Sequence, residues 1–375
     1  MPRRRTSLLL LKKYHMNHKD ASRVSSNVFD SVIVVGPNLN DRGGITSVIN
    51  SYRAVFPAFH YLPTNSGHGF VCGAFVLGTT LVRLPFARLF KRRRLLHVHV
   101  ASGKSFFRKS LIVAWGRILG YKIILHCHSG LIKDYAAARG ADSLRPTFDK
   151  ASTVVALTES WREYYRSTFG CRSVDVINNI VAPAEVKNFP PRRSEGPLHL
   201  LFLGKICEAK GIFDLLELME ANASRWRDRV RLVVGGNGET ERLQEEIRRL
   251  GISDLVDFVG WVDGTRKEEL LSAADLMILP SYAEGLPITI LEAMAHGIPA
   301  IASDVGGIPE MMADGITGTI HAPGDRKAIA DAIDFYLCNP GEITRRGKAA
   351  LDSVVPYYPD RVLKSIEELY NKALS

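Results

Sequence analysis

The sequence predicts two α/β domains, each a doubly wound parallel sheet. Its 375 residues exceed what one hydrophobic core usually supports. Short runs rich in Val and Ile alternate with helix-length amphipathic segments, a pattern typical of parallel strands covered by helices on both faces. A segment with four prolines, residues 183–197, separates two such series and is the predicted linker.

The first series predicts a domain at residues 28–190. Its candidate strands are continuous apolar runs without strict alternation, which favours strands buried on both faces. Two helix-length segments lie between them, at 47–55 and 107–119. The predicted strands are 32–35, 96–100, 123–126, 153–156 and 174–177.

The second series predicts a domain at residues 197–355 with the same alternation. A last helix, 360–374, follows Pro359 and is too isolated to start a new domain, so we expect it to pack back on the first domain. The predicted strands of this series are 198–203, 230–234, 256–259, 276–279 and 300–302, and the predicted helices are 212–222, 239–250, 267–272 and 287–296.

Charge divides the chain into a basic and an acidic half. Residues 1–200 carry 30 basic and 11 acidic side chains, whereas residues 201–375 carry 19 and 28. Between Asp41 and Asp134 there are fourteen Lys and Arg residues but no Asp or Glu. A basic half of this strength attracts a polyanion, so either nucleic acid or an anionic membrane surface is the expected partner.

The N-terminal residues 1–27 are predicted to form a basic, disordered arm. Three arginines followed by four leucines resemble the start of a signal peptide, but the apolar stretch is too short and Lys12 and Lys13 close it. An idle leader is the alternative for this exposed terminus. The five cysteines are scattered and lack a C-x-x-C pair, which indicates a reducing compartment rather than disulfides or structural zinc.

Residues 70–90 are the most apolar stretch of the sequence. Arg83 and Arg88 interrupt it, so we expect no segment apolar enough to span a bilayer. Its mixture of Leu and Phe with these arginines and the basic run 91–94 favours a helix lying in a membrane interface. Pro85 has to open or kink such a helix. A buried helix with a solvated basic end is the alternative.

The segment 280–299 carries the most chemical information. Pro287 suits the first position of a helix, and Gly297 ends that helix. The helix N-terminus offers unpaired amides to an anion, while the carboxylates of Glu284 in the loop and Glu292 in the helix suit sugar hydroxyls. Either Glu alone is more often a solvated surface residue, but the glycine and proline frame favours a site.

Two other loops of the second domain are candidates for a diphosphate site. Lys205 follows a strand end and Lys210 opens the next helix, so two cations meet at one βα loop. Residues 235–238, which include Gly236 and Asn237, predict a tight βα turn that permits close backbone approach. This turn lacks the third glycine of a dinucleotide-binding fingerprint.

In this order the segments resemble a retaining GT-B glycosyltransferase of the family-4 type, the glycosyl transferases group 1. The resemblance covers about residues 31–375 and is most specific from 200 to 325. Its E-x7-E signature runs from Glu284 to Glu292. It implies two Rossmann-like domains facing each other across a cleft, with the nucleotide sugar on the second and the acceptor on the first.

The resemblance also implies a role for each matched residue. Glu284 is expected to hold the donor sugar, Glu292 the nucleotide ribose, and Lys205 and Lys210 the diphosphate. The family more often has Arg at the Lys205 position, so one bidentate contact is lost here. Main chain near Trp261 is expected to recognise the base. The segment whose backbone is expected to hold sugar and phosphate is Gly285, Leu286, Pro287 and Ile288.

In the first domain, Gly43 and Gly44 resemble the family's glycine loop, which approaches the donor phosphate. His128 lies at a strand end, where family members place a histidine against the donor sugar and the acceptor. Two H-x-H pairs lie on neighbouring predicted strands, but no carboxylate or cysteine cluster completes a metal site, so none is expected. The histidines of these pairs are His97, His99, His126 and His128.

The expected reaction is a metal-independent hexosyl transfer with retention of configuration from a UDP- or GDP-sugar, without a cofactor. No carboxylate nucleophile stands out in the first domain, and no D-x-D motif occurs in the chain. The resemblance therefore implies a front-face mechanism, in which the leaving diphosphate accepts the proton of the acceptor and the basic residues stabilise that diphosphate.

The acid-free stretch then falls in the acceptor domain, which moves the expected polyanion from nucleic acid to an anionic membrane. We expect a saccharide or a polyprenyl-diphosphate-linked acceptor, and a cytoplasmic protein at the inner face of the membrane that acts in cell-surface polysaccharide or glycolipid synthesis. Three alternatives are a sugar-nucleotide 2-epimerase, a non-catalytic GT-B scaffold and a nucleic-acid-binding protein. No recognisable RNA- or DNA-binding module supports the last of these.

Overall fold

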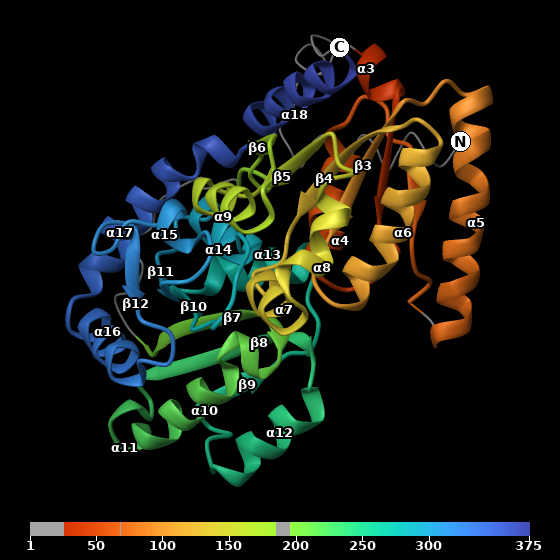
Figure 1. Ribbon diagram of the computed structural model, residues 1–375. Helices are drawn as coiled ribbons and strands as arrows, with labels where there is room; N and C mark the ends of the chain where they lie inside the picture. The colour runs from red at the N-terminus through yellow and green to blue at the C-terminus, as the bar shows by residue number, and fades with distance from the viewer. Residues whose placement is uncertain (1–25, 68, 185–195) are drawn as a thin grey trace. The chain divides into compact units, whose positions relative to one another are not determined.

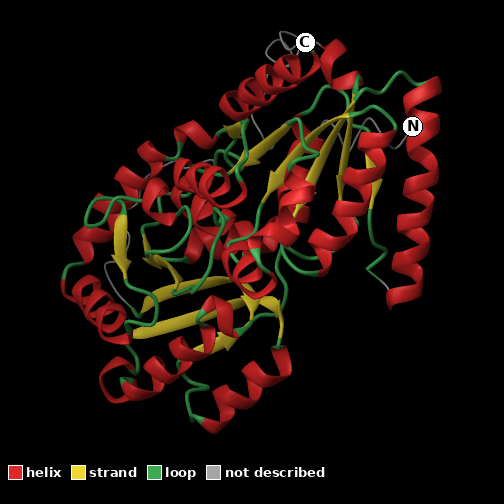
Figure 2. Cartoon of the chain, viewed as in Figure 1, coloured by secondary structure: helices red, strands yellow, loops and turns green. Residues whose placement is uncertain are grey.

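The computed structural model describes residues 26–375 except residue 68 and residues 185–195. The expected arm at 1–27 therefore lies almost wholly outside the described residues, as does most of the expected linker. The described chain divides into two compact units, which Figures 1 and 2 show. Unit 1 runs up to Ile180 and includes Tyr357–Ser375, and unit 2 is Val181–Pro356.

Unit 1 is built on a six-stranded parallel sheet with the order β2-β1-β3-β4-β5-β6. Its central strands are buried along almost their whole length, as the apolar runs predicted. The strands are β1 (Val32–Gly36), β2 (Tyr61–Pro63), β3 (Leu95–Val100), β4 (Lys122–Cys127), β5 (Thr153–Ala156) and β6 (Val174–Val176). The helices are α3 (Ser26–Asp30), α4 (Gly44–Val55), α5 (Gly69–Phe90), α6 (Lys104–Ile118), α7 (Ile132–Arg139), α8 (Ala141–Phe148), α9 (Glu159–Phe169) and α18 (Pro359–Leu374).

Unit 2 repeats the architecture with the strand order β12-β11-β10-β7-β8-β9. Two doubly wound parallel sheets confirm the predicted fold class. The strands are β7 (Leu198–Ile206), β8 (Val230–Gly238), β9 (Val256–Phe258), β10 (Leu276–Leu279), β11 (Ala300–Ser303) and β12 (Gly318–His321). The helices are α10 (Ile212–Ala221), α11 (Ala223–Trp226), α12 (Thr240–Arg249), α13 (Gly264–Ala273), α14 (Ile288–Ala295), α15 (Ile308–Met311), α16 (Arg326–Cys338) and α17 (Pro340–Ser353), with short turns η1 (Glu208–Lys210) and η2 (Val355–Tyr357).

The C-terminal helix α18 belongs to unit 1, where it contacts α3, β3 and β4. Its buried face ends in Tyr370, whose hydroxyl lies 2.6 Å from Nδ1 of His97 on β3. Lys372 Nζ lies 2.8 Å from a carboxylate oxygen of Asp175. The last turn of the chain therefore reaches the centre of the first sheet.

Helix α5 continues through Pro85, so this proline does not open the helix, which was one of the two expectations. Proline has no N–H, so the carbonyl of Leu81, four residues earlier, loses its helical donor. The indole Nε1–H of Trp115 on α6 donates to that carbonyl at 3.0 Å and replaces the missing bond. Leu84 is fully buried, which identifies the inner side of α5.

Apart from Leu84 and Thr80, the described residues of α5 are exposed or half-buried. Only 11% of the segment Val71–Phe90 is buried, and its mean hydropathy is 1.3. By length and composition alone, this helix is apolar enough to cross a membrane, so the expectation that no segment meets that test was too strict. The alternative of a buried helix is wrong for this segment of the described chain.

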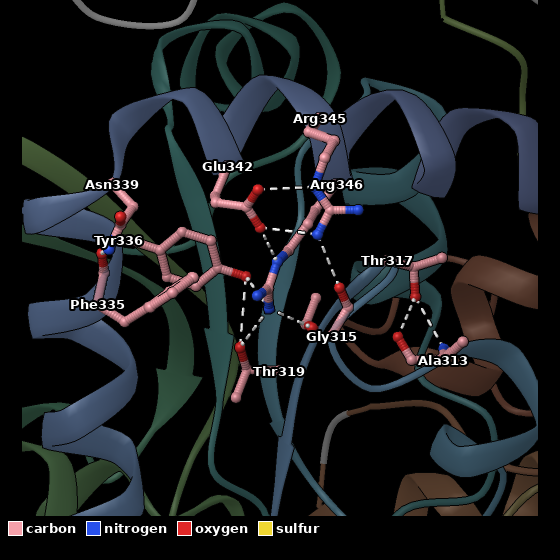
Figure 3. A network of polar contacts seen from close by, with 11 residues as sticks. Ala313, Gly315, Thr317, Thr319, Phe335, Tyr336, Asn339, Glu342, Arg345 and Arg346 are labelled. Carbon is pink, nitrogen blue, oxygen red and sulfur yellow. Dashed lines mark hydrogen bonds and ion pairs between the residues drawn. The ribbon is translucent and has the colours of Figure 1, made fainter.

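In unit 2 an arginine-centred network fastens the edge strand β12 to α16 and α17 (Figure 3). Arg346, which is 9% exposed, donates to the carbonyl of Gly318 at 3.0 Å and pairs with Glu342 at 2.9 Å. Its guanidinium also lies over the ring of Phe335, 4.8 Å from the centroid. An edge strand has a strand neighbour on one side only, so side-chain hydrogen bonds to its backbone take the place of those from a second strand.

Candidate functional site

The candidate donor site lies where the winding of the unit 2 sheet reverses. Strands β7 and β10 are neighbours, and the chain leaves β7 toward β8 on one side and β10 toward β11 on the other. In open parallel sheets, ligands bind outside the carboxyl ends of the strands at such a point. Lys205 and Lys210 belong to the end of β7 and the turn after it, and Glu284 follows β10.

Lys210 and Glu284 meet at this point. Nζ of Lys210 lies 2.5 Å from Oε1 of Glu284, and Oγ of Ser281 donates to the same oxygen at 2.8 Å. The Glu284 side chain is 8% exposed and that of Lys210 is 24% exposed. The expected sugar-binding carboxylate is thus held in a fixed, nearly buried position by a cation and a hydroxyl.

Two glycines with left-handed backbone bring the surrounding loops together. Gly211 has φ +66°, and a Cβ there would lie 2.0 Å from the carbonyl oxygen of Pro280. Gly306 has φ +59°, and a Cβ there would lie 1.9 Å from the carbonyl oxygen of Glu284. The backbone N–H of Gly307 donates to the carbonyl of Gly285 at 2.8 Å. The position of the Glu284 loop therefore depends on two glycines, because a residue with a Cβ cannot adopt this backbone conformation and approach without strain.

Two expectations at the end of β7 need correction. Residues 235–238 do not form a βα turn, because β8 continues to Gly238 and pairs in register with β7. Gly236 faces Gly204 there, and a Cβ on it would lie 1.9 Å from the carbonyl oxygen of Gly204. The two glycines let β7 and β8 pair closely at this point, so the chain forms a strand here and not a turn. Asn237 is consequently the strand partner of Lys205.

Lys210 also differs from the expectation. It does not open a helix but ends the short turn η1, after which Gly211 leads into α10. Lys205 lies inside β7 and is exposed. The structure therefore places Lys210 against Glu284, whereas Lys205 remains a solvent-facing cation at the same strand end.

Helix α14 begins at Ile288, with Pro287 as its N-cap and Leu286 4% exposed. The predicted helix start is thus displaced by one residue. Glu292, inside the helix, pairs with Lys267 of α13 and is 18% exposed. Trp261 donates from Nε1 to a carboxylate oxygen of Asp263 at 3.0 Å. Because of its bond to Lys267 and its 18% exposure, Glu292 is a paired carboxylate at a partly accessible position.

In unit 1 the glycine loop lies at the corresponding reversal, between β1 and β3. Gly43 is the N-cap of α4 and Gly44 is the first residue of that helix. A Cβ at either position would meet no atom of the described chain within 4 Å, and neither residue has a left-handed φ. Neither packing nor backbone geometry therefore demands glycine at the N-terminus of α4.

The four histidines of β3 and β4 form one stacked group on one face of the unit 1 sheet. His97 Nε2 lies 3.0 Å from His126 Nδ1, and His99 Nδ1 lies 2.8 Å from His128 Nε2. The rings of His126 and His128 are stacked with centroids 4.2 Å apart. The predicted proximity of the two H-x-H pairs follows from the register, in which His99 is the strand partner of His126.

Burial keeps these histidines neutral. It lowers the pKa of His97 and of His128 to about 3, with the charge of nearby Lys109 adding to the effect at His128. Burial, with the neighbouring histidines, also holds the pKa values of His99 and His126 well below the usual range. Neutral imidazoles share protons with one another, so each bond in the group needs one donor and one acceptor nitrogen.

His97, His99 and His126 each bring one ring nitrogen within 4.8 Å of the others, a spacing open to a metal ion. Two of the three rings already bond to each other, and His97 bonds to Tyr370 as well. Three neutral imidazoles can hold zinc in proteins, but here a metal would have to displace the hydrogen bond between His97 Nε2 and His126 Nδ1. The geometry therefore fits a hydrogen-bonded network better than a metal centre.

A family model settles the affiliation of unit 2. The model of the glycosyl transferases group 1 matches residues 184–352, which include the Lys210–Glu284 pair and Glu292. These residues belong to the glycosyl transferases group 1 family.

Curated relatives agree with this family. Glycogen synthase of Mycobacterium tuberculosis is 31% identical over 182 residues, which are 48% of this chain and 44% of that protein. Phosphatidyl-myo-inositol mannosyltransferase of Mycobacterium leprae is 27% identical over 281 residues, which are 73% of this chain and 72% of that protein. The chain thus spans less than half the length of the first of these relatives.

Solved structures share the GT-B fold. The structure of HepE from Anabaena in complex with UDP-glucose superposes with a TM-score of 0.68 at 16% identity, covering 92% of this chain and 99% of that one. At 16% identity this similarity shows the fold alone, and it is the fold that the sequence resemblance implied.

Sequence reasoning missed three residues at or near the candidate sites. Ser281 bonds to Glu284, and its Ser-x-x-Glu spacing was the available signal. Lys267 pairs with Glu292 from another helix, which only the fold reveals. Lys109 is 1% exposed, donates to Ser105 Oγ at 2.8 Å and has a pKa lowered by burial to about 7. Its place on the apolar stripe of α6 was the signal for that buried cation.

Proposed function

We propose that this chain is a retaining glycosyltransferase that moves a sugar from a nucleoside-diphosphate sugar to a saccharide or lipid-linked acceptor. The observation that carries the proposal is the Lys210–Glu284 pair at the reversal point of the family-matched unit. A cation beside a nearly buried carboxylate suits a ligand that presents a diphosphate next to sugar hydroxyls.

The chemistry assigned to each group follows from its charge and place. Lys210 and the exposed Lys205 stabilise negative charge on the departing diphosphate, and the first amides of α14 add the positive end of a helix dipole. Glu284 accepts hydrogen bonds from sugar hydroxyls, and Glu292 accepts them from the ribose. A UDP-sugar is the preferred donor, since HepE, which shares this fold, was solved with UDP-glucose.

Protection against thermal unfolding tests the donor class. UDP-, GDP- and ADP-sugars are added to the full chain, with Glu284→Ala as the site variant and Glu239→Ala, in an exposed ion pair of unit 2, as the matched control. We expect one nucleotide sugar to raise the Tm of the wild type and of the control, but not of Glu284→Ala. Absence of protection by every nucleotide sugar contradicts the proposal.

We further propose that unit 1 docks on an anionic membrane through the outer face of α5 and the neighbouring α6. Six apolar side chains of α5 recur at helical spacing and are between 59% and 79% exposed. A contiguous row of exposed apolar side chains is uncommon on monomeric proteins and marks a surface that binds a partner. They are Val71, Phe75, Val82, Phe86, Leu89 and Phe90.

Charge complementarity selects an anionic bilayer as the occupant of this face. The basic run 91–94 follows α5 directly, and Lys91, Arg92 and Arg94 are exposed. Arg93 instead pairs with Asp30 at 3.6 Å. An apolar stripe flanked by lysine and arginine suits a helix lying in an interface, with each cation contributing about 1 kcal/mol near an anionic surface. This arrangement supports a lipid-linked acceptor and a cytoplasmic location at the inner face of the membrane.

Vesicle flotation tests the membrane proposal. The triple variant Lys91→Glu, Arg92→Glu and Arg94→Glu is expected to lose binding to anionic vesicles while keeping protection by the nucleotide sugar. Reversal of Arg229, Arg248 and Lys348, three exposed basic residues of unit 2, is the matched control and is expected to keep vesicle binding. Binding to oligonucleotides in place of vesicles favours the nucleic-acid alternative, and intact vesicle binding by the α5 variant contradicts the proposal.

A further inference from the structure

An apolar groove of about 680 Å³ lies between the C-terminal halves of α5 and α6. The lining of this α5/α6 groove comes from the segment 81–86 of α5 and the segment 111–118 of α6 and includes no charged residue. Val82, Phe86 and Ile118 belong to it and are between 59% and 75% exposed. Ligand sites are typically concave and mostly apolar with few polar groups, so this groove suits one apolar chain.

Hydrogen bonds between neighbouring elements fix the inner wall of the groove. The indole of Trp115, a lining residue, donates to the carbonyl of Leu81 at 3.0 Å, and the hydroxyl of Tyr121 donates to the carbonyl of Leu84 at 2.8 Å. The Leu81 carbonyl is available because Pro85 has no N–H. These bonds join α5 to α6 and to the residue before β4, so the shape of the groove does not depend on a ligand.

Arg88 lies where the groove ends, beside the residues that follow α6. Its guanidinium is 5.9 Å from the ring centroid of Tyr121, and its Nη2 is 3.9 Å from the position of a Cβ on Gly120. The side chain is half-buried and forms no ion pair in the described part of the chain; its Nε is buried without a partner, whereas the two terminal nitrogens are not. An arginine without a counter-charge suits a phosphate, which accepts two parallel N–H bonds from it.

This end of the groove belongs to the amino edge of the unit 1 sheet. Tyr121 directly precedes β4, and the basic run 91–94 directly precedes β3. The strands are parallel, so these residues lie at the edge opposite the carboxyl ends, where ligands of doubly wound sheets bind. A lipid whose phosphate lies on Arg88 therefore has its polar group away from that edge. This position favours a phospholipid of the membrane over the acceptor of the proposed transfer.

We propose that the α5/α6 groove binds one acyl chain of an anionic phospholipid, with the phosphate of that lipid on Arg88. The lipid is a discrete ligand, in contrast to the bilayer surface on which the outer face of α5 is proposed to dock. The surrounding charge selects an anionic lipid, because no Asp or Glu occurs between Asp41 and Asp134. The inference rests on the proposed membrane docking for the source of the lipid and does not depend on glycosyl transfer.

Titration calorimetry of the full chain with dihexanoyl phosphatidylglycerol, dissolved as monomers below its critical micelle concentration, tests the site. We expect saturable binding of one lipid per chain. Dihexanoyl phosphatidylcholine is expected to bind more weakly, because its choline adds a positive charge beside Arg88 and the basic run 91–94. Each methylene removed from the bound chain should weaken binding about fourfold.

Variants locate the site. Ala114→Phe fills the groove and is expected to weaken phosphatidylglycerol binding about tenfold or more, whereas Ala74→Phe, at an exposed position of α5 outside the lining, is the matched control. Arg88→Gln should weaken binding and remove the preference over phosphatidylcholine, and Arg83→Gln, exposed on the same helix, should do neither. Ile118→Ser, which shortens an exposed lining side chain, is the second groove variant if Ala114→Phe does not fold.

Several results would overturn the proposal. They are absence of phosphatidylglycerol binding, equal affinity for phosphatidylcholine, unchanged affinity in both groove variants, and adsorption of many lipids per chain without saturation. Tighter binding of farnesyl phosphate than of phosphatidylglycerol assigns the groove to the isoprenoid chain of an acceptor instead. Vesicle flotation is scored separately, and Ala114→Phe is expected to keep it. Failure of the groove is therefore distinguishable from failure of membrane docking, in which the wild type itself does not float.

Discussion

Nζ of Lys210 lies 2.5 Å from Oε1 of Glu284, so the cation expected at the diphosphate and the carboxylate expected at the sugar form one ion pair. They reach this point from the ends of two adjacent strands, β7 and β10. Each charge therefore sets the electrostatic environment of the other. A nucleotide sugar that uses both groups must exchange part of this pairing for contacts of its own.

Removing Lys210 is expected to cost stability as well as affinity. Among the described residues, Lys210→Met leaves the nearly buried carboxylate of Glu284 with the Ser281 hydroxyl alone, a loss of about 1–3 kcal/mol in the free energy of unfolding. The double variant Lys210→Met and Glu284→Gln is expected to recover part of that loss, because no buried charge remains unpaired. Urea unfolding measures the free energy of unfolding of the single and the double variant, and Lys205→Met is the control at an exposed lysine. A double variant less stable than Lys210→Met contradicts the ion-pair account.

Gly306→Ala is expected to displace the Glu284 loop. The added Cβ combines a left-handed φ with a 1.9 Å approach to the Glu284 carbonyl oxygen, at a cost of about 2–5 kcal/mol. Gly315→Ala is the matched control, since its φ is +70° but a Cβ there meets nothing within 4 Å. Thermal unfolding and donor titration should show loss of stability and of donor affinity for Gly306→Ala. Equal effects of the two substitutions on donor affinity would argue against the loop contact.

Lys109 is expected to make stability depend on pH. Burial lowers its pKa to about 7, against about 10.4 in an unfolded chain. Between these values the unfolded chain binds more protons than the folded chain, so the free energy of unfolding rises with pH across this window. The difference of about 3.5 in pKa corresponds to at most about 5 kcal/mol.

Unfolding of wild type and Lys109→Met between pH 6.5 and about pH 9.5 isolates this contribution. The stability of the wild type relative to Lys109→Met should increase as the pH rises, because the variant lacks the titrating group. Lys104→Met, at the exposed start of the same helix, is the control and should show a constant difference. A constant difference for Lys109→Met as well contradicts a lowered pKa for the buried Lys109 in the folded chain.

The Arg346 network predicts unequal effects of two adjacent arginines (Figure 3). Arg346 has a 10% exposed side chain and bonds to the β12 backbone, whereas Arg345 is 54% exposed. Arg346→Met is expected to lower the free energy of unfolding by about 2–3 kcal/mol, because buried acceptors on β12 and α16 lose their donor. Arg345→Met should cost less than about 1 kcal/mol. Denaturant titration distinguishes the two, and equal losses would contradict the assigned role of Arg346.

The sequence predicted the central strands because buried parallel strands are continuous apolar runs. Strands β2 and β12 were missed, since each lies at a sheet edge and contains only three or four residues with little apolar character. The prediction of a turn at residues 235–238 was wrong for a physical reason. Glycines usually mark turns, but here they allow β8 to pass close to Gly204 of β7.

The candidate site was predictable in its residues but not in its pairings. Glu284 and Lys210 stand out from spacing and loop context, yet their ion pair requires β7 and β10 to be adjacent, which no local pattern specifies. The same holds for His99 and His128, whose bond depends on the register of β3 and β4. The sequence left an exposed and a buried α5 as alternatives, because the apolar pattern of a helix is the same in both cases, and the structure shows the exposed one.

Calorimetric titration of UDP and of the matching UDP-sugar tests the central claim most directly. The account predicts that Lys210→Met weakens both ligands about tenfold or more, whereas Glu284→Gln weakens the UDP-sugar alone and leaves UDP binding unchanged or stronger, because Lys210 is released from its ion pair. Equal losses of UDP and UDP-sugar affinity in Glu284→Gln, or unchanged UDP affinity in Lys210→Met, would contradict the account.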